Sequence, residues 1–463
     1  MNPLELPELR AHISRYISPS TASICARVSK DWSKDFAPQV WHTLDFQMFD
    51  NKDAPDVKVF NKYGHHIRVV KHLQTAFKMS LLQSSSVSNL ESLDLIMDSS
   101  EDCARYASFV LAHNHACLKS VGIIGSFQAG ERMIAYSFSH IVGLGLGVPI
   151  FSRLTHMQLH GLGMVRETFS CMLADCPVLE HLEIHDTIMI DGVISHIHQT
   201  PSVKTLCADL RQVFYMDPDD VTQVPLLAHF PNLKKYDTGS FEHLEPFTTY
   251  EMMQYYVDKF SPQVMSLRAL STASHGLLME VFKDLTEICV SYENVYFPDI
   301  FHHYETLQVV RMYKKSEDCY ERDSYFDLED IRAEEGAMVH VMAYRCHGLK
   351  VLDMPLHIAD IRGPEVLPWG CAGLEELHMR FMSLDTPEKI NHTLQMWVER
   401  RKLIPSAVGD TDSSQGRVQI NGWGTQIRAF SKESEPIEER VVRHLLRFRN
   451  LRKVWLGTTT WTA

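Results

Sequence analysis

Three closely spaced pairs of histidines are the residues whose type and spacing could do chemistry, because imidazole is a common ligand of transition metals. They are His113 and His115, His196 and His198, and His302 and His303. No glutamate, aspartate or cysteine stands at metal-site spacing from any pair, and no His-Glu-x-x-His is present. We therefore expect surface or hydrogen-bonded histidines rather than a metal centre.

Other motifs that carry chemistry are also missing. The ten cysteines contain no Cys-x-x-Cys pair, so buried reduced thiols are a better interpretation than a zinc site. The glycine-rich segment 143–147 lacks the third glycine of a dinucleotide-binding loop. Neither a Gly-x-Ser-x-Gly elbow nor a Walker loop occurs. We predict no catalytic residues, no metal and no cofactor, and expect a protein that is not an enzyme.

Composition limits the partners. A chain of 463 residues with 45% hydrophobic and 22% charged residues is globular, and its length predicts two or three domains or a repeat array. A net charge of -13 disfavours nucleic acid as a partner. The N-terminus does not resemble a signal peptide, and the longest apolar run, 141–151, is too short to span a bilayer. We expect no membrane partner and a location in the cytoplasm or nucleus.

The elements that position any functional residue follow one repeated spacing, Leu-x-x-apolar-x-apolar. Its leading position falls at Leu90, Leu118, Leu154, Leu179, Leu285, Leu307, Leu349, Leu374 and Leu451. Degenerate copies begin at Ile67, Val203, Leu233 and Val264. Several neighbouring copies are 24 or 25 residues apart, which is the length of a leucine-rich repeat.

Each copy predicts a short strand followed by a returning helix. We expect helices over 165–176, over 190–198, and around Ile390, Leu394 and Trp397, where apolar residues share one helical face. In such an array the residues between the buried strand positions line the concave face and are the candidates for binding a substrate. They are His156, Gln158, Glu180, His181, Glu183, Asp353, Glu376, His378, Lys453 and Trp455. The alternative is a solvated face without a partner.

The first forty residues follow a helical spacing instead. Leu6, Leu9, Ile13 and Ile17 fall on one helical face before Ser18-Pro19 ends the helix, and a second stripe comprises Cys25, Val28, Trp32 and Phe36. These stripes predict two or three short helices that contain a small core.

The same residues resemble an F-box. The resemblance lies in segment 3–9, in Ile13 and 16–17, in segment 25–32 with its Val-Ser-Lys-x-Trp, and in Trp41. With the repeats that follow, the chain resembles irregular fungal F-box proteins with leucine-rich-repeat-like tails.

The resemblance implies a substrate-recognition subunit of an SCF-type ubiquitin ligase, which binds a Skp-type adaptor and, through it, a cullin–RING ligase. The implied adaptor-binding residues are Pro3, Leu4, Leu6, Pro7, Ile13 and Ile17, with Val28 and Trp32 in the surrounding core. The substrate is an unknown protein. The alternatives are that these helices cap the first repeat and that the chain is a non-catalytic interaction scaffold with no ligase link.

The predicted fold class is therefore α/β: a short all-α F-box-like module followed by an irregular leucine-rich-repeat-like solenoid with parallel strands and outer helices. We expect the module at 1–46 and the solenoid at 47–400, interrupted by a charged insertion at 314–335. A flexible linker is expected at 401–418, and a C-terminal repeat or cap, which includes Trp461, at 419–463.

Overall fold

The computed structural model describes most of the chain. The described residues are 5–49, 56–83, 85–97, 101–125, 151–185, 187–190, 198–208, 210–214, 225–238, 250–260, 262–269, 275–291, 297–313, 338–384, 386–403, 435–456 and 459–462. Pro3, Leu4, the segments 143–147 and 314–335, and residues 404–418 lie outside them. No helix in the described ranges is long and apolar enough to cross a membrane.

Three short helices form the N-terminal helical module, residues 5–41. They are α1 (Pro7–Ser14), α2 (Pro19–Ala26) and α3 (Lys30–Val40). The hydroxyls of Ser18 and Ser29 accept hydrogen bonds from backbone amides in the first turns of α2 and α3, which fixes where both helices begin. Ala22, Phe36 and Ala37 are buried between the helices.

Two details of this module differ from the sequence prediction. The helix α1 ends at Ser14, so Ile17 lies beyond it, next to the residue that caps α2. Val28 was expected in the core but is 63% exposed, because it lies in the turn between α2 and α3. Trp32 is partly buried and stacks on Phe36. The predicted stripe was therefore divided between two helices that do not share one continuous face.

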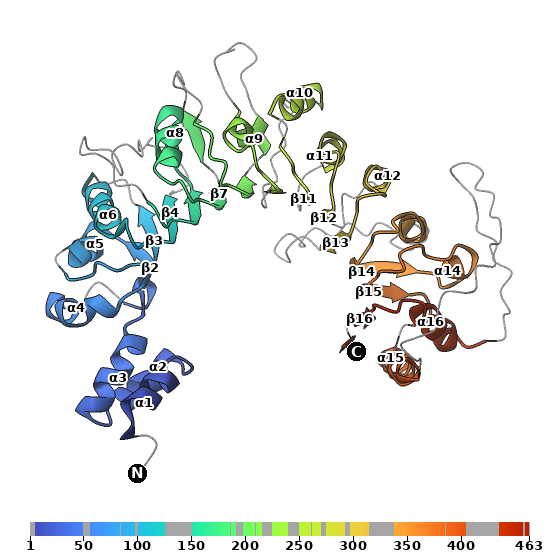
Figure 1. The fold of residues 1–463 in the computed structure, drawn as a ribbon, viewed down its shortest axis with the longest axis horizontal. Coiled ribbons are helices and arrows are strands. Elements are labelled where there is room, and N and C mark those ends of the chain that lie inside the picture. Colours follow the sequence, from blue (N-terminus) through green and yellow to red (C-terminus); the bar gives the residue numbers. More distant parts are fainter. Residues whose placement is uncertain are drawn as a thin grey trace, which may run out of the picture. The chain divides into compact units, whose positions relative to one another are not determined.

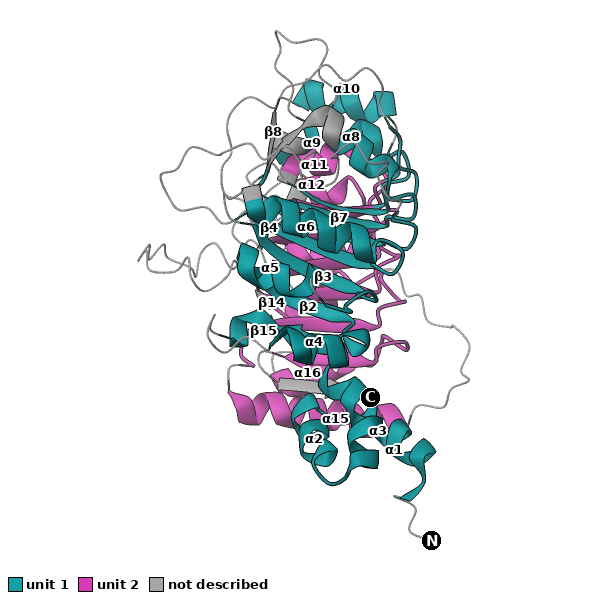
Figure 2. Cartoon of the chain, turned by 90° about the vertical axis from the view of Figure 1, so that its left-hand side faces the viewer, with its two compact units in different colours: residues 1–234, 247–263 teal, residues 235–246, 264–463 magenta. Residues whose placement is uncertain are grey.

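The chain divides into two compact units (Figure 2). Unit 1 comprises residues 1–234 and 247–263, and unit 2 comprises residues 235–246 and 264–463. In the described part of unit 1, the sheet order is β1 (Thr43–Asp45), β2 (Val69–Gln74), β3 (Ser92–Met97), β4 (Ser120–Gly125), β5 (His156–His160), β7 (His181–His185) and β9 (Thr205–Ala208). These strands are parallel, and β6 (Gly163–Val165) pairs with β8 (Ile188–Ile190) in a separate small sheet.

Unit 2 continues the same construction. Its described strands follow the order β10 (Lys235–Asp237), β11 (Ser266–Ala269), β12 (Glu287–Ser291), β13 (Val309–Tyr313), β14 (Val351–Ala359), β15 (Glu376–Phe381), β16 (Lys453–Leu456) and β17 (Thr459–Thr462). The strands β10 to β16 are parallel, whereas β17 returns antiparallel to β16 and pairs Trp461 with Val454. The prediction of parallel strands therefore holds except for this last pair.

Helices lie on one side of the strands in each unit (Figure 1). In unit 1 they are α4 (Val57–Tyr63), α5 (Ala76–Gln83), α6 (Glu101–Asn114), α8 (Arg166–Ala174), α9 (Leu210–Phe214) and α10 (Tyr250–Phe260), with short 3-10 turns η2 (Phe46–Met48), η3 (Gly64–His66) and η4 (Leu226–His229). In unit 2 they are α11 (His275–Val281), α12 (Phe297–Phe301), a helix over 338–345, α14 (Arg362–Val366), α15 (Pro387–Lys402) and α16 (Ile437–Leu445). The sheets therefore have one covered face and one face without helices.

The repeated spacing determines where the strands begin. Every leading position, including the four degenerate copies, is buried, and the corresponding strand begins two residues later. Leu90 precedes β3 in this way, and Leu349 precedes β14. The alternating apolar residues of each strand then point toward the helices, as in Leu93 and Leu95 of β3, and are buried. The predicted strand-and-helix construction is confirmed.

Two of the predicted helices are present, whereas a third helix and two boundaries differ from the prediction. The helix over 165–176 corresponds to α8, and Ile390, Leu394 and Trp397 are buried on α15. The prediction of a helix over 190–198 is wrong at its first residue, because Ile190 is the last residue of strand β8. Residues 191–197 lie outside the described ranges. The helix α15 runs to Lys402 and so enters the first two residues of the expected linker. The strand β1 lies within the segment assigned to the F-box-like module.

Two contacts hold the module and the segment that follows β1 against the helices of unit 1. Trp41, at the end of α3, stacks on Tyr63 at the end of α4, with ring centroids 5.1 Å apart. Lys78 of α5 is buried, and its Nζ donates hydrogen bonds to the backbone carbonyls of Phe46 at 3.2 Å and Phe49 at 3.0 Å. The buried ammonium therefore fixes the segment that follows β1.

Replacing Lys78 by methionine is expected to lower the free energy of unfolding by about 1–3 kcal/mol, because two carbonyls lose their hydrogen-bond donor. Urea denaturation of the full chain, followed by circular dichroism, measures the loss. Lys58→Met, at an exposed position on α4, is the control and should change little. Equal stability of the two variants would show that the two carbonyls do not depend on Lys78.

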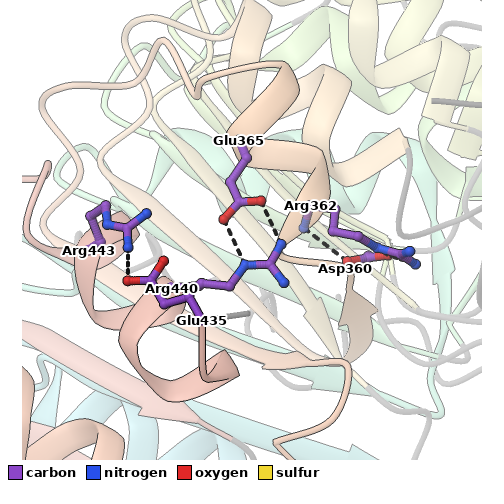
Figure 3. A network of polar contacts seen from close by, with 6 residues as sticks. All are labelled: Asp360, Arg362, Glu365, Glu435, Arg440 and Arg443. Carbon is purple, nitrogen blue, oxygen red and sulfur yellow. Dashed lines mark hydrogen bonds and ion pairs between the residues drawn. The ribbon is translucent and has the colours of Figure 1, made fainter. Parts of the chain in front are cut away.

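An ion pair attaches α16 to α14 in unit 2 (Figure 3). Arg440 donates two hydrogen bonds to the Glu365 carboxylate of α14, at 2.8 and 2.5 Å, and its side chain is only 12% exposed. Beside this pair, Arg362 binds Asp360, and Arg443 binds Glu435. Bidentate pairing of a poorly exposed arginine is geometrically specific. It fixes the position of the C-terminal helix although residues 404–434 separate α16 from α15 in the sequence.

Candidate interaction surfaces

The N-terminal helical module exposes several large apolar side chains. Tyr16 is 77% exposed and Ile24 is 67% exposed, and Val28 lies close to them in the sequence. On α1, Leu9 and Ile13 are 40% and 37% exposed. The predicted adaptor-binding residues Leu6 and Pro7 are also exposed, while Ile17 is partly buried. On α1 the exposed apolar residues share one helical face, and an exposed apolar helix face is one kind of surface that another protein can cover.

The side of each sheet that lacks helices is called here the open face. It carries the strand residues that alternate with the buried positions. In unit 1, the predicted residues lie on neighbouring strands: His156 of β5 is in register with His181 of β7, and Gln158 with Glu183. The two imidazole rings stack with centroids 4.3 Å apart. Four of the predicted residues are therefore brought together.

Glu180 has a different position from the other predicted residues of unit 1. It immediately precedes β7, and its carboxylate binds Lys204 at 2.6 Å. This hydrogen bond is the main cause that lowers the pKa of Glu180. Because this carboxylate already binds Lys204, and both residues immediately precede their strands, we place Glu180 at the border of the open face.

The sequence interpretation missed three side chains beside this group. His160 and His185 are in register at the ends of β5 and β7, and Cys207 of β9 lies 3.8 Å from Nε2 of His185. Glu183 lies 3.7 Å from the same imidazole nitrogen, and this polar contact with His185 is the main cause that lowers the pKa of Glu183. The sequence pattern could have identified His160 and His185, because each lies two residues beyond a predicted open-face residue on the same strand.

A second polar group lies on the open face of unit 1 near β1 to β4. His72 adopts a left-handed backbone conformation, with φ of 51°, where the pairing of β2 with β3 shifts its register. Its Nδ1 lies 2.8 Å from the carboxylate of Asp45 on β1. A bulged residue with positive φ costs conformational energy. Nothing in the sequence pattern predicted this bulge, because it interrupts the alternation.

In unit 2, the predicted residues also form one cluster. Asp353 of β14 accepts a hydrogen bond from Nδ1 of His378 on β15 at 2.8 Å, and the His378 ring lies 5.5 Å from the Trp455 ring on β16. Glu376 and Lys453 form an ion pair at 3.0 Å, and the Lys453 ammonium lies 5.7 Å from the centroid of Trp455. All five predicted residues are in direct register contact across three strands.

The missed residues of unit 2 extend this cluster. Arg311 of β13 lies between two carboxylates, 3.9 Å from Glu287 and 3.7 Å from Asp353. Further along the sheet, Arg268 lies 3.3 Å from Asp237. Arg311 follows Leu307 by four residues, as Asp353 follows Leu349, so the repeat spacing could have identified it. The open face of unit 2 thus carries charges of both signs that are largely neutralised by neighbours.

The described residues contain no group of three or more His, Cys, Asp or Glu side chains that could hold a metal ion. Two of the buried cysteines do not resemble nucleophiles. Burial raises the pKa of the Cys289 thiol on the open face of unit 2 to about 12, and that of Cys346 to about 12 as well. A thiol that stays protonated at neutral pH is a poor nucleophile.

No protein-family model matches this chain, and no curated protein matches it in sequence. The functional assignment therefore depends on the residues and geometry described above.

Proposed function

We propose that this chain is the substrate-recognition subunit of an SCF-type E3 ubiquitin ligase. In this proposal the N-terminal helical module is an F-box that binds a Skp-type adaptor, and the strand-and-helix repeats are leucine-rich-repeat-like. The observation that carries the proposal is the exposed apolar surface of the module, which includes Leu6, Leu9 and Ile13. An amphipathic helix with an exposed apolar face is suited to a complementary apolar groove.

The proposed mechanism is tethering without bond chemistry. The module would hold the adaptor and, through it, the cullin–RING ligase, while an open face holds a protein substrate. Holding both partners on one chain raises the local concentration of substrate lysines near the ligase. The polar clusters on the open faces, such as Asp353 with His378, support this role because they offer a partner several side chains at fixed spacing.

Co-expression with a Skp-type adaptor, followed by size-exclusion chromatography, tests the proposal. The wild-type chain is expected to elute with the adaptor in a one-to-one complex. The double substitution Leu6→Asp and Ile13→Asp is expected to abolish co-elution, because each introduces a charge into an apolar contact. The matched control is Val178→Asp with Met382→Asp, which places the same charges on exposed apolar positions outside the module.

Elution of the wild-type chain alone would contradict the ligase assignment. The alternative is then a protein-interaction scaffold whose helical module caps the first repeat. The stacking of Trp41 on Tyr63 and the pairing of β1 with β2 favour such a cap, because they cover the beginning of the sheet in unit 1. A cap and an adaptor-binding module are compatible, since these contacts leave Leu6 and Ile13 exposed.

A further inference from the structure

We infer that a basic cluster near the C-terminus of unit 2 binds an acidic segment of a partner protein. The cluster comprises Arg401 and Lys402 at the end of α15, and Arg447, Arg449 and Arg452 between α16 and β16. The inference rests on the proposed function, because the protein that presents the acidic segment is then the substrate. It depends on three observations: cations without a carboxylate partner, a hydrogen bond that gathers them, and an exposed leucine beside them.

The cluster consists of the cations that the protein's own carboxylates leave unpaired. The described segments 386–403 and 435–456 hold ten basic residues against five acidic ones, a net charge of +5 in a chain whose net charge is -13. Five of the ten basic side chains are engaged within unit 2: Arg400 by Glu439, Arg440 by Glu365, Arg443 by Glu435, Lys453 by Glu376, and Lys389 by the Ser383 carbonyl. The other five are the cluster, and none of them forms an ion pair with the residues that the structure describes.

A hydrogen bond joins the two parts of the cluster. Nη2 of Arg401 donates to the backbone carbonyl of Arg449 at 2.9 Å, so the last turn of α15 lies against the segment that follows α16. The Arg401 guanidinium also lies over the ring of the buried Trp397, 5.3 Å from its centroid, which fixes its position. The other four side chains are exposed, and each lies within three positions of this contact in the sequence. Five positive charges are therefore held around one fixed point.

The cluster borders the surface on which the substrate is proposed to bind. Arg452 immediately precedes β16, and the next alternate position on that strand, Lys453 with Trp455 after it, lies on the open face of unit 2. A substrate that occupies this open face can thus extend an acidic segment over its border to reach the cluster.

Stabilisation of helix ends does not account for the cluster. A cation in the last turn of a helix is favoured by the helix dipole, and Arg401 and Lys402 have that position on α15. Arg447, Arg449 and Arg452 instead lie beyond Leu445, where α16 ends. Like charges held around one contact repel one another, and an acidic partner would relieve this repulsion.

A protein segment suits this surface better than a nucleic acid does. Leu403, next to Lys402, is 80% exposed, and an apolar side chain of a bound peptide can cover it. The helices α15 and α16 also carry Glu399, Glu438 and Glu439, which would repel a long phosphate backbone laid across them. The expected ligand is therefore a short peptide segment that is acidic and carries an apolar residue.

Fluorescence polarisation with the full-length chain tests the inference. The probe is a fluorescein-labelled peptide of eight glutamates with one leucine at its centre, and the control peptide has glutamine in place of each glutamate. We expect saturable binding of the glutamate peptide and at least tenfold weaker binding of the glutamine peptide. The affinity for the glutamate peptide should also fall as the salt concentration is raised, because salt screens exposed charges.

Two variants of equal net charge locate the binding site. The cluster variant replaces three exposed arginines that follow α16: Arg447→Gln, Arg449→Gln and Arg452→Gln. The control variant replaces three exposed arginines elsewhere in the chain: Arg15→Gln, Arg153→Gln and Arg345→Gln. The cluster variant should bind the glutamate peptide at least tenfold more weakly than the wild type, whereas the control variant should stay within twofold of it. Because both variants lose three positive charges, long-range attraction is matched between them.

The inference is wrong if the glutamate peptide does not bind, or if the two variants bind it equally. Tighter binding of a twelve-nucleotide single-stranded DNA, or of vesicles that contain phosphatidylserine, would overturn it as well, because the cluster would then serve another class of partner. Adaptor binding is measured separately by size exclusion. A chain that binds the glutamate peptide but not the adaptor would keep the cluster as a binding site and lose the ligase assignment.

Discussion

Lowering the pH from 7.5 to 4.5 is expected to remove several kcal/mol from the free energy of unfolding, with the loss arising in unit 2. Burial lowers the pKa of His340 and of His357 to about 4, and that of His444 to about 3. In the unfolded chain these groups have their ordinary pKa of 6.5. The unfolded state therefore binds protons first, and stability falls as the pH drops from 6.5 toward 4. Each histidine contributes on the order of 2–3 kcal/mol to this loss.

The geometry around His444 explains why its protonation is so unfavourable. Its ring meets Trp369 edge-on with centroids 4.6 Å apart, and it also meets the rings of Phe448 at 5.1 Å and Phe381 of β15 at 6.2 Å. The His444 side chain is buried among them. Neither ring nitrogen has a hydrogen-bond partner among the described residues. His340 differs, because its Nδ1 accepts a hydrogen bond from Trp369 Nε1 at 3.0 Å. The positive charges of Arg447 and His340 would further disfavour a proton on His444.

His444→Phe separates this cause from general acid unfolding. The variant is expected to be at least as stable as the wild type at pH 7.5 and about 2 kcal/mol more stable at pH 5, because phenylalanine cannot bind a proton. Urea denaturation at several pH values, followed by tryptophan fluorescence, measures both. His392→Phe, exposed on α15, is the control and should follow the wild-type pH dependence. A wild-type stability that is constant from pH 7.5 to 5 would contradict the expectation.

The repeat spacing predicted the strands well because its leading and alternating apolar positions are the buried ones. A residue such as Leu307 must enter the core two residues before its strand, and the alternation that follows separates buried from open-face positions. The same rule placed His378 and Trp455 correctly on the open face, and it would have added Arg311. Candidate positions could thus be read one strand at a time.

What the sequence could not predict depends on several strands at once. The cluster of Asp353, His378 and Trp455 requires the register of three strands, which the lengths of the intervening helices and loops determine. The bulge at His72 breaks the alternation that the prediction used. In the helical module, the capping hydroxyl of Ser29 starts a new helix and so leaves Val28 exposed in a turn.

Removing Asp35 is expected to open the N-terminal helical module. Its carboxylate binds Nε of Arg10 at 2.5 Å and joins α3 to α1. The Arg10 side chain is only 7% exposed, so Asp35→Leu leaves a buried guanidinium without its carboxylate, at a cost of roughly 3 kcal/mol. Arg10→Met should cost less, because Asp35 is the more exposed partner and water can solvate it. Hydrogen exchange of residues 7–40 measures the local opening.

The double substitution Arg10→Met with Asp35→Leu provides the decisive comparison. It leaves no unpaired charge, so protection from exchange should return close to the wild-type level, and adaptor binding with it. Asp31→Leu, exposed on the same helix, is the control. Loss of adaptor binding in Asp35→Leu together with recovery in the double variant would show that the ion pair acts by positioning α1.

By contrast, Leu6→Asp with Ile13→Asp should lose adaptor binding while hydrogen exchange stays slow, because those side chains lie on the surface. If hydrogen exchange in the double variant remained as fast as in Asp35→Leu, the ion pair would stabilise the module by more than the neutralisation of a buried charge.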